Sequence, residues 1–110
     1  MSFQLTTRQV RERTKTVTRR DGWEYLKPGE LVLACEKCQG LRKGEKVRTL
    51  CVIRILNTRR EPLNRIDQAD CVREGFPEMT PAQFIEFFGR THDECVPAKV
   101  VTRIEFEYVD

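Results

Sequence analysis

The sequence lacks the features that mark membrane and secreted proteins. No apolar run approaches the roughly 20 residues that cross a bilayer. The opening residues 1–5 do not show the charged-then-apolar pattern of a signal peptide. We therefore expect an intracellular, cytoplasmic protein that has no membrane partner.

Common signatures of catalysis are missing as well. There is no glycine-rich phosphate loop, no serine, histidine and aspartate in a hydrolase order, and no zinc-deaminase pattern. Internal repeats, low-complexity tracts and linkers are also absent. We expect no organic cofactor and, by default, a monomer.

The length and composition that are present describe one small globular domain. The 110 residues are 39% hydrophobic and 34% charged, so we take residues 1–110 as a single domain with one modest core. The net charge of +3 hides an asymmetry, because residues 1–60 hold 15 basic and 6 acidic residues, whereas residues 61–110 hold 5 and 11. A basic first half indicates a polyanionic partner such as RNA, or a fold in which the two halves face each other.

Periodicity and capping signals predict short helices between strands, in a small α+β fold. Strands are expected over 31–34, which is apolar throughout, and over 47–58 and 100–109, which alternate. A first helix is expected over 8–13, with a threonine cap and with Leu5 and Val10 facing the core. Two further helices should run from Asp67 to Gly75 and from a Thr80 cap to Gly89. Strands with helices inserted between them favour a partly closed β-barrel.

The five cysteines do not suggest a disulfide framework, because their number is odd and no secretory signal is present. Cys35 and Cys38 form a C-x-x-C pair, and His92 and Cys95 form an H-x-x-C pair. Together these four side chains would complete a structural zinc site. Free thiols and a redox C-x-x-C remain the alternatives, and the other two cysteines are expected to be buried small hydrophobes.

The stretch 13–20 is polar and basic, and no hydrophobic period fits it. Four cationic side chains and three threonine hydroxyls stand within eight residues, a density of donors suited to phosphate oxygens or a base edge. We expect this stretch at the mouth of a pocket. The alternative is a solvated loop after a helix, as most charge runs are.

Three ordered segments carry a resemblance to a known family. They are Lys15 to Arg20, Leu26 to Val32, and Arg73 to Phe76 followed by Phe84 and the closing strand 102–106. In this order they are similar to the ASCH domain, and the similarity spans nearly the whole chain. Thr14 stands where the family usually has glycine. The resemblance implies a PUA-like, partly closed β-barrel related to RNA-binding domains.

The resemblance also implies a site. In ASCH proteins similar to a bacterial enzyme, a lysine, a threonine and a glutamate act in hydrolysis of the acetyl amide of N4-acetylcytidine, and these match Lys15, Thr18 and Glu74. The same polar set suits reversible binding of RNA or a nucleoside. We place this interpretation first because binding requires fewer specific features of the sequence than catalysis does. A salt bridge between Lys15 and Glu74, with Thr18 capping a turn, is the purely structural alternative.

RNA or nucleotide binding would use further side chains. We expect Arg13, Arg19 and Arg20 to contact the ligand, with the latter two at the rim of the pocket and Trp23 or Tyr25 as a stacking platform. A lone tryptophan in a small domain is more often a core residue. A zinc-stabilised interaction module without catalysis is a third possibility for the whole chain.

Overall fold

The computed structural model describes residues 1–37, 42–92 and 96–109. The elements follow the chain in the order η1 (Gln4–Thr6), α1 (Thr7–Arg11), β1 (Val17–Arg20), β2 (Leu31–Cys35), β3 (Thr49–Pro62), η2 (Leu63–Arg65), α2 (Gln68–Arg73), α3 (Pro81–Thr91) and β4 (Val100–Val109). The fold is therefore α+β, as the sequence predicts.

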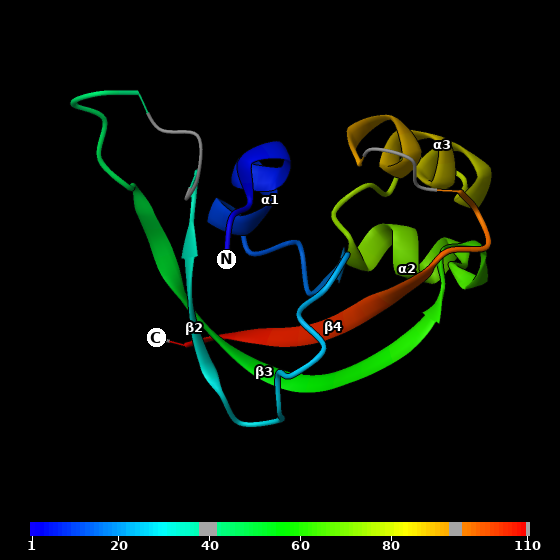
Figure 1. Ribbon diagram of the computed structural model, residues 1–110, viewed down its shortest axis with the longest axis horizontal. Coiled ribbons are helices and arrows are strands. Elements are labelled where there is room, and N and C mark those ends of the chain that lie inside the picture. Colours follow the sequence, from blue (N-terminus) through cyan, green and yellow to red (C-terminus); the bar gives the residue numbers. More distant parts are fainter. Residues whose placement is uncertain (38–41, 93–95, 110) are drawn as a thin grey trace.

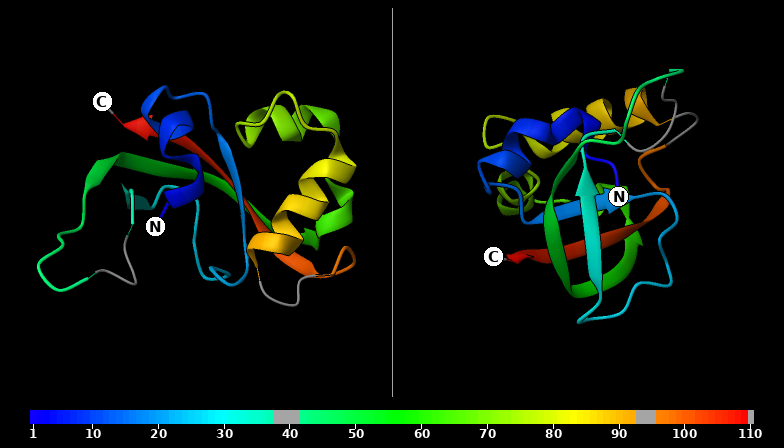
Figure 2. Two further views of the ribbon diagram at one scale, coloured as in Figure 1. Left: turned by 90° about the horizontal axis from the view of Figure 1, so that it is seen from above. Right: turned by 90° about the vertical axis from the view of Figure 1, so that its left-hand side faces the viewer.

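All four strands belong to one antiparallel sheet with the order β1-β4-β3-β2. The long strands β3 and β4 bend strongly, and the helices lie on the concave side of the sheet (Figure 1). Seen from the end, the sheet curls into a half-barrel (Figure 2). A register shift between Ile55 and Asn57 interrupts the pairing of β3 with β4, the kind of irregularity that increases local twist and bending.

Local signals account for the later helices. The side chain of Asp67 accepts a hydrogen bond from the amide of Asp70 at the start of α2. Thr80 and Gln83 form a reciprocal capping box at the start of α3. Both caps were predicted, but α3 continues to Thr91, beyond the glycine expected to end it.

Three local expectations were wrong. Helix α1 has no side-chain cap: Thr6, at its N-cap, makes no capping hydrogen bond, and the hydroxyl of Thr7 donates to the carbonyl of Phe3. Leu5 is 58% exposed rather than directed into the core. Strand β2 is buried on one face only, since Leu31 and Leu33 are 60% and 50% exposed while Ala34 is buried.

The largest difference concerns the basic stretch. Its second half forms β1, an edge strand that pairs with β4 from Val17 opposite Glu105 to Arg20 opposite Thr102. Three of its four residues are buried. Burial of so polar a segment requires partners from elsewhere in the chain, and these partners define the candidate site.

Two apolar clusters lie on either side of that site. The first packs the N-terminal segment against the sheet and includes Phe3, Val10, Ile53, Ile55, Ile104 and Phe106. The second packs α2 and α3 against the start of β4 and includes Leu63, Ile66, Cys71, Phe76, Phe84, Phe88 and Val101. Trp23 is partly buried and packs against the first cluster, as a core residue would.

Candidate functional site

A buried ion pair joins Lys15, just before β1, to Glu74, at the end of α2. The Nζ atom of Lys15 donates to Oε1 of Glu74 at 2.7 Å and to the main-chain oxygen of the same residue at 2.9 Å. Both residues are only 2% exposed. The two charged halves of the sequence therefore do face each other at this point.

The pair is the end of a larger buried network. Arg19 donates from Nη1 to Oε2 of Glu74 at 3.1 Å, and from Nη2 to Oδ2 of Asp70. Arg103, on β4, forms a two-pronged contact with the same carboxylate, at 2.8 Å from Nε and 3.0 Å from Nη2. Arg73 adds a further bond to Asp70 at 2.9 Å. The Asp70 carboxylate is thus held by the guanidinium fork of Arg103, the geometry that suits a carboxylate best, whereas Glu74 receives one bond each from Lys15 and Arg19 to its two side-chain oxygens.

Burial and charge shift the pKa values of these groups in predictable directions. Desolvation lowers the pKa of Lys15, although the attraction of Glu74 opposes the shift. Desolvation alone would raise the pKa of Asp70, but hydrogen bonds from Arg103, Arg19 and Arg73 outweigh it and hold that pKa well below its usual range. Asp70 is therefore ionised at neutral pH.

Local contacts fix the position of Lys15. The amide of Thr16 donates to the carbonyl of Arg73 at 2.7 Å, which joins the start of β1 to the end of α2. The hydroxyl of Tyr108 donates to the carbonyl of Lys15. Gly75, with a φ of +95°, lets α2 end against Gln9, where a Cβ atom would come within 2.7 Å of the Gln9 Cγ.

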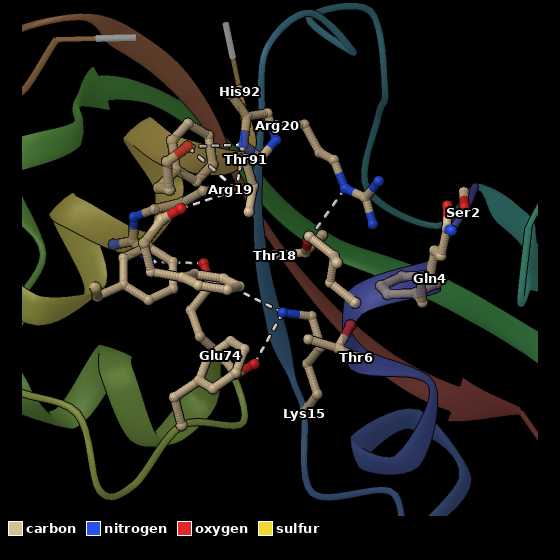
Figure 3. Close-up of a pocket in the computed structure, with 16 residues that line it drawn as sticks. Ser2, Gln4, Thr6, Lys15, Thr18, Arg19, Arg20, Glu74, Thr91 and His92 are labelled. Carbon is tan, nitrogen blue, oxygen red and sulfur yellow. Dashed lines mark hydrogen bonds and ion pairs between the residues drawn. The ribbon is translucent and has the colours of Figure 1, made fainter.

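A pocket of about 200 Å³ opens beside the ion pair (Figure 3). Its walls come from the N-terminal segment, β1, the end of α2 and one face of α3. The residues that line it are Ser2, Phe3, Gln4, Leu5, Thr6, Lys15, Thr18, Arg19, Arg20, Glu74, Phe76, Phe84, Phe87, Phe88, Thr91 and His92. One side is aromatic and the other is polar and cationic.

The aromatic side has a flat, ordered component. The ring of His92 stacks on that of Phe88 with centroids 3.8 Å apart and planes 6° apart, and its Nδ1 lies 3.0 Å from the Phe88 carbonyl oxygen. Phe84 packs against Phe88 with centroids 6.2 Å apart. A planar ligand would find a stacking surface here.

The structure brings together some of the predicted site residues and separates others. Lys15, Thr18 and Glu74 line the same pocket. The Thr18 hydroxyl accepts a hydrogen bond from Nε of Arg20 at 3.1 Å, and within the described residues it shares none with Lys15. Arg20 is half-buried and lines the pocket, in keeping with a place at the rim.

Two of the proposed ligand-contacting residues, Arg13 and Trp23, do not line the pocket, and Arg19 lines it without lying at its rim. Arg19 is only 3% exposed and bridges two carboxylates, so its expected place at the rim was wrong. Arg13 lies over the ring of Tyr108, 5.4 Å from its centroid, and does not line the pocket. Trp23 does not line it either, and stands next to Tyr25 with ring centroids 6.0 Å apart.

Sequence reasoning missed the second carboxylate and its partners. Asp70 was expected only as part of a helix and Arg103 as the outer face of a strand, yet they are 4% and 5% exposed. Phe84, Phe87 and Phe88 stand at helical spacing in α3, a pattern that predicts core packing alone, yet they also line the pocket. The alternation of β4 could not reveal the role of Arg103, because both faces of that strand are covered.

Two of the four predicted zinc ligands, Cys38 and Cys95, lie outside the described residues. Cys35 is disulfide-bonded, which differs from the zinc ligand or free thiol expected from the sequence. In the described ranges, no three histidine, cysteine, aspartate or glutamate side chains are grouped so as to hold a metal ion. Cys71 is buried and Cys51 partly buried, both as free thiols.

Comparison with known proteins defines the fold but not a family. No protein-family model and no curated protein sequence matches the chain. Among solved structures, the chain is similar to protein EF3133 from Enterococcus faecalis V583, described under the family model DUF984. The TM-score is 0.64 at 19% identity, over 96% of this chain and 68% of that one. At this identity the likeness establishes a shared fold.

No helix within residues 1–37, 42–92 and 96–109 is both long enough and apolar enough to cross a bilayer.

Proposed function

We propose that the chain is a PUA-like domain of the ASCH type that binds a nucleoside, a nucleotide or an unpaired RNA base in the pocket beside Lys15 and Glu74. The observation that carries the proposal is the composition of that pocket. An aromatic wall faces a strand that presents buried, hydrogen-bonded charges and a threonine hydroxyl. Bases are recognised by this combination of stacking with polar contacts to their edges.

The size of the pocket limits the ligand. At about 200 Å³ it lies below the range of about 300–1,000 Å³ that is usual for sites that enclose a drug-sized molecule. One base fits this limit better than a whole nucleotide, and the sugar would lie at the mouth. Cytidine is the natural first probe because the resemblance to ASCH proteins points to it.

Binding can be measured by titrating cytidine and N4-acetylcytidine into the protein and following the NMR signals of the His92 ring, the one histidine in the sequence. We expect saturable shifts with either ligand and weaker binding by Lys15→Met. Lys27→Met is the matched control, because Lys27 is exposed and does not line the pocket. Absence of saturable shifts in folded protein at millimolar ligand would overturn the proposal.

Hydrolysis of N4-acetylcytidine to cytidine and acetate is the second candidate. It is favoured by one observation, the presence of Thr18 in the same pocket as Lys15 and Glu74. A threonine hydroxyl needs a neighbouring base to take its proton before it can attack an acyl carbon. Burial lowers the pKa of Lys15, which is the direction that suits a base, but its ammonium is paired with Glu74. Catalysis therefore requires a rearrangement that reversible binding does not.

The enzymatic candidate has a direct test. Purified protein is incubated with N4-acetylcytidine and release of cytidine is followed, with Lys15→Ala as the control. Turnover above that control would establish the reaction. Equal rates for the two proteins, together with binding of cytidine, would leave the domain as a binding module.

A further inference from the structure

Arg20 differs from the buried cations of the site, because it has no carboxylate partner among the described residues. Lys15, Arg19 and Arg103 each form an ion pair with Glu74 or Asp70. By contrast, no carboxylate of the described residues lies within 4.0 Å of the Arg20 guanidinium. Its one hydrogen bond in that part of the chain runs from Nε to the Thr18 hydroxyl.

The position of Arg20 directs its free donors toward the pocket. Thr18 and Arg20 are two residues apart in β1, so their side chains leave the same face of the strand. Figure 3 shows them on one side of β1 together with Ser2 and Gln4, while Arg19 and Glu74 lie on the other side. The guanidinium also lies over the ring of Phe3, 4.8 Å from its centroid. These contacts engage Nε and one face of the Arg20 guanidinium. Among the described residues, they leave its Nη atoms available as hydrogen-bond donors to a ligand.

Holding an unpaired guanidinium in a half-buried place is unfavourable unless an anion completes it. Burial lowers the pKa of Arg20 to about 10, which still leaves the group charged at neutral pH. The excess positive charge of the site is therefore concentrated at the mouth of the pocket rather than at the buried ion pair.

We propose that the Arg20 guanidinium, with the hydroxyl of Thr18, forms an anion subsite that binds a phosphate group attached to the nucleoside held in the pocket. This inference rests on the proposed function and makes it more specific. A base stacked toward His92 would lie across β1 from Arg20, so its phosphate would reach the guanidinium as the sugar leaves the pocket. The ligand class is then a nucleoside phosphate, whether a free nucleotide or a residue of RNA.

The subsite can be tested with four probes that separate base from phosphate. Cytidine carries the base alone, ribose 5-phosphate the anion alone, cytidine 5′-monophosphate both, and the dinucleotide cytidylyl-(3′→5′)-cytidine a phosphodiester. Each is titrated calorimetrically into the unaltered protein and into Arg20→Gln. We expect the monophosphate to bind about tenfold more tightly than cytidine, and Arg20→Gln to abolish that difference.

Two further variants keep the result interpretable. Arg65→Gln removes one positive charge from an exposed arginine that does not line the pocket, and should leave all affinities unchanged. Arg20→Lys keeps the charge but not the fork, and should retain part of the preference for the monophosphate. Thermal unfolding of each variant shows whether the fold is intact. If Arg20→Gln does not fold, the preference of Arg20→Lys for the monophosphate over cytidine, compared with that of the unaltered protein, tests the anion subsite.

The outcomes separate this inference from the proposed function. Ribose 5-phosphate binding that depends on Arg20, without any binding of cytidine, would support the anion subsite and contradict the nucleoside pocket. Cytidine binding with no advantage for either phosphate-bearing probe would overturn the subsite and leave the pocket. A preference for the dinucleotide over the monophosphate would assign the site to RNA, and the reverse would assign it to free nucleotides.

Discussion

The ammonium of Lys15 is held twice by Glu74, at 2.7 Å by a side-chain oxygen and at 2.9 Å by the main-chain oxygen. The two partners do not depend on each other equally. Glu74 has a second cation, Arg19, at 3.1 Å, whereas Lys15 has no other carboxylate in ion-pair range among the described residues. Loss of either partner should therefore have different consequences.

We expect Glu74→Gln to lower the free energy of unfolding by about 3–5 kcal/mol, because it leaves Lys15 buried without a countercharge. Lys15→Met should cost clearly less, since Glu74 keeps Arg19. Urea denaturation of both variants measures the difference. The exposed Glu78→Gln is the control and should change little. Equal losses for the two variants would contradict the asymmetry.

The acid stability of the protein should depend on Asp70. Its pKa in the folded state lies below the ordinary value of about 3.9. The resulting stabilisation is fully present above that value and is lost as the pH falls through the lower pKa of the folded state. We expect Asp70→Asn to lower stability near neutral pH by about 3–5 kcal/mol, because three arginines lose a charged partner.

The same variant should show a shallower loss of stability between about pH 4 and pH 2 than the unaltered protein. Urea midpoints measured across that range test the slope. Asp21→Asn is the comparison, because Asp21 pairs with Lys99 at 2.9 Å at the surface, with 59% of its side chain exposed. Such a pair contributes at most about 1 kcal/mol. Parallel pH profiles for Asp70→Asn and the unaltered protein would refute the assignment.

The elements that the sequence could predict are those specified by neighbouring residues. Thr80 and Gln83 signal the start of α3 within four positions, and the alternation of Ile104 and Phe106 marks β4. Strand β1 could not be predicted in this way. Arg19 is buried there only because Asp70 and Glu74, more than fifty positions away, supply its countercharges.

The candidate site likewise contains residues that the sequence could identify and residues that it could not. The resemblance to ASCH proteins named Lys15, Thr18 and Glu74, and these three residues line one pocket, while their roles remain predictions. The bridge of Arg19 between Asp70 and Glu74 and the fork of Arg103 on Asp70 have no sequence signature, because an arginine in an alternating strand is normally exposed. A charged residue that fits both the alternation of its strand and its usual preference for the surface gives no sign of burial in the sequence. Its burial can be recognised only in the folded chain.

Gly75 should be intolerant of a side chain for two separate reasons. Its φ of +95° disfavours any L-residue, and a Cβ atom would approach Cγ of Gln9 to 2.7 Å. Gly22 has a similar φ of +87° but has nothing within 4 Å of that position. We therefore expect Gly75→Ala to destabilise the protein by about 1 kcal/mol or more beyond the cost of Gly22→Ala. Thermal or urea unfolding of the two variants makes the comparison.

The zinc prediction can be tested by metal analysis of protein purified without a tag and kept reduced, because the sulfur of a disulfide is not a thiolate ligand. We expect about one zinc ion per chain, lost in Cys35→Ser and retained in Cys51→Ser. The second variant is a suitable control because Cys51 is a free, partly buried thiol on β3. Less than about half an equivalent of zinc in the unaltered protein would contradict a four-ligand structural site.

Two aromatic groups could serve as the stacking platform for a base, and one substitution in each distinguishes them. His92 lies on Phe88 at the pocket wall, whereas Tyr25 is 71% exposed beside Trp23 and lies outside the pocket. Stacking of a base on an aromatic side chain contributes about 1–3 kcal/mol. We therefore expect His92→Ala to weaken cytidine binding about fivefold or more, and Tyr25→Ala to leave it unchanged. Calorimetric titration of both variants provides the measurement. Weaker binding by Tyr25→Ala with normal binding by His92→Ala would move the base from the pocket to the surface formed by Trp23 and Tyr25.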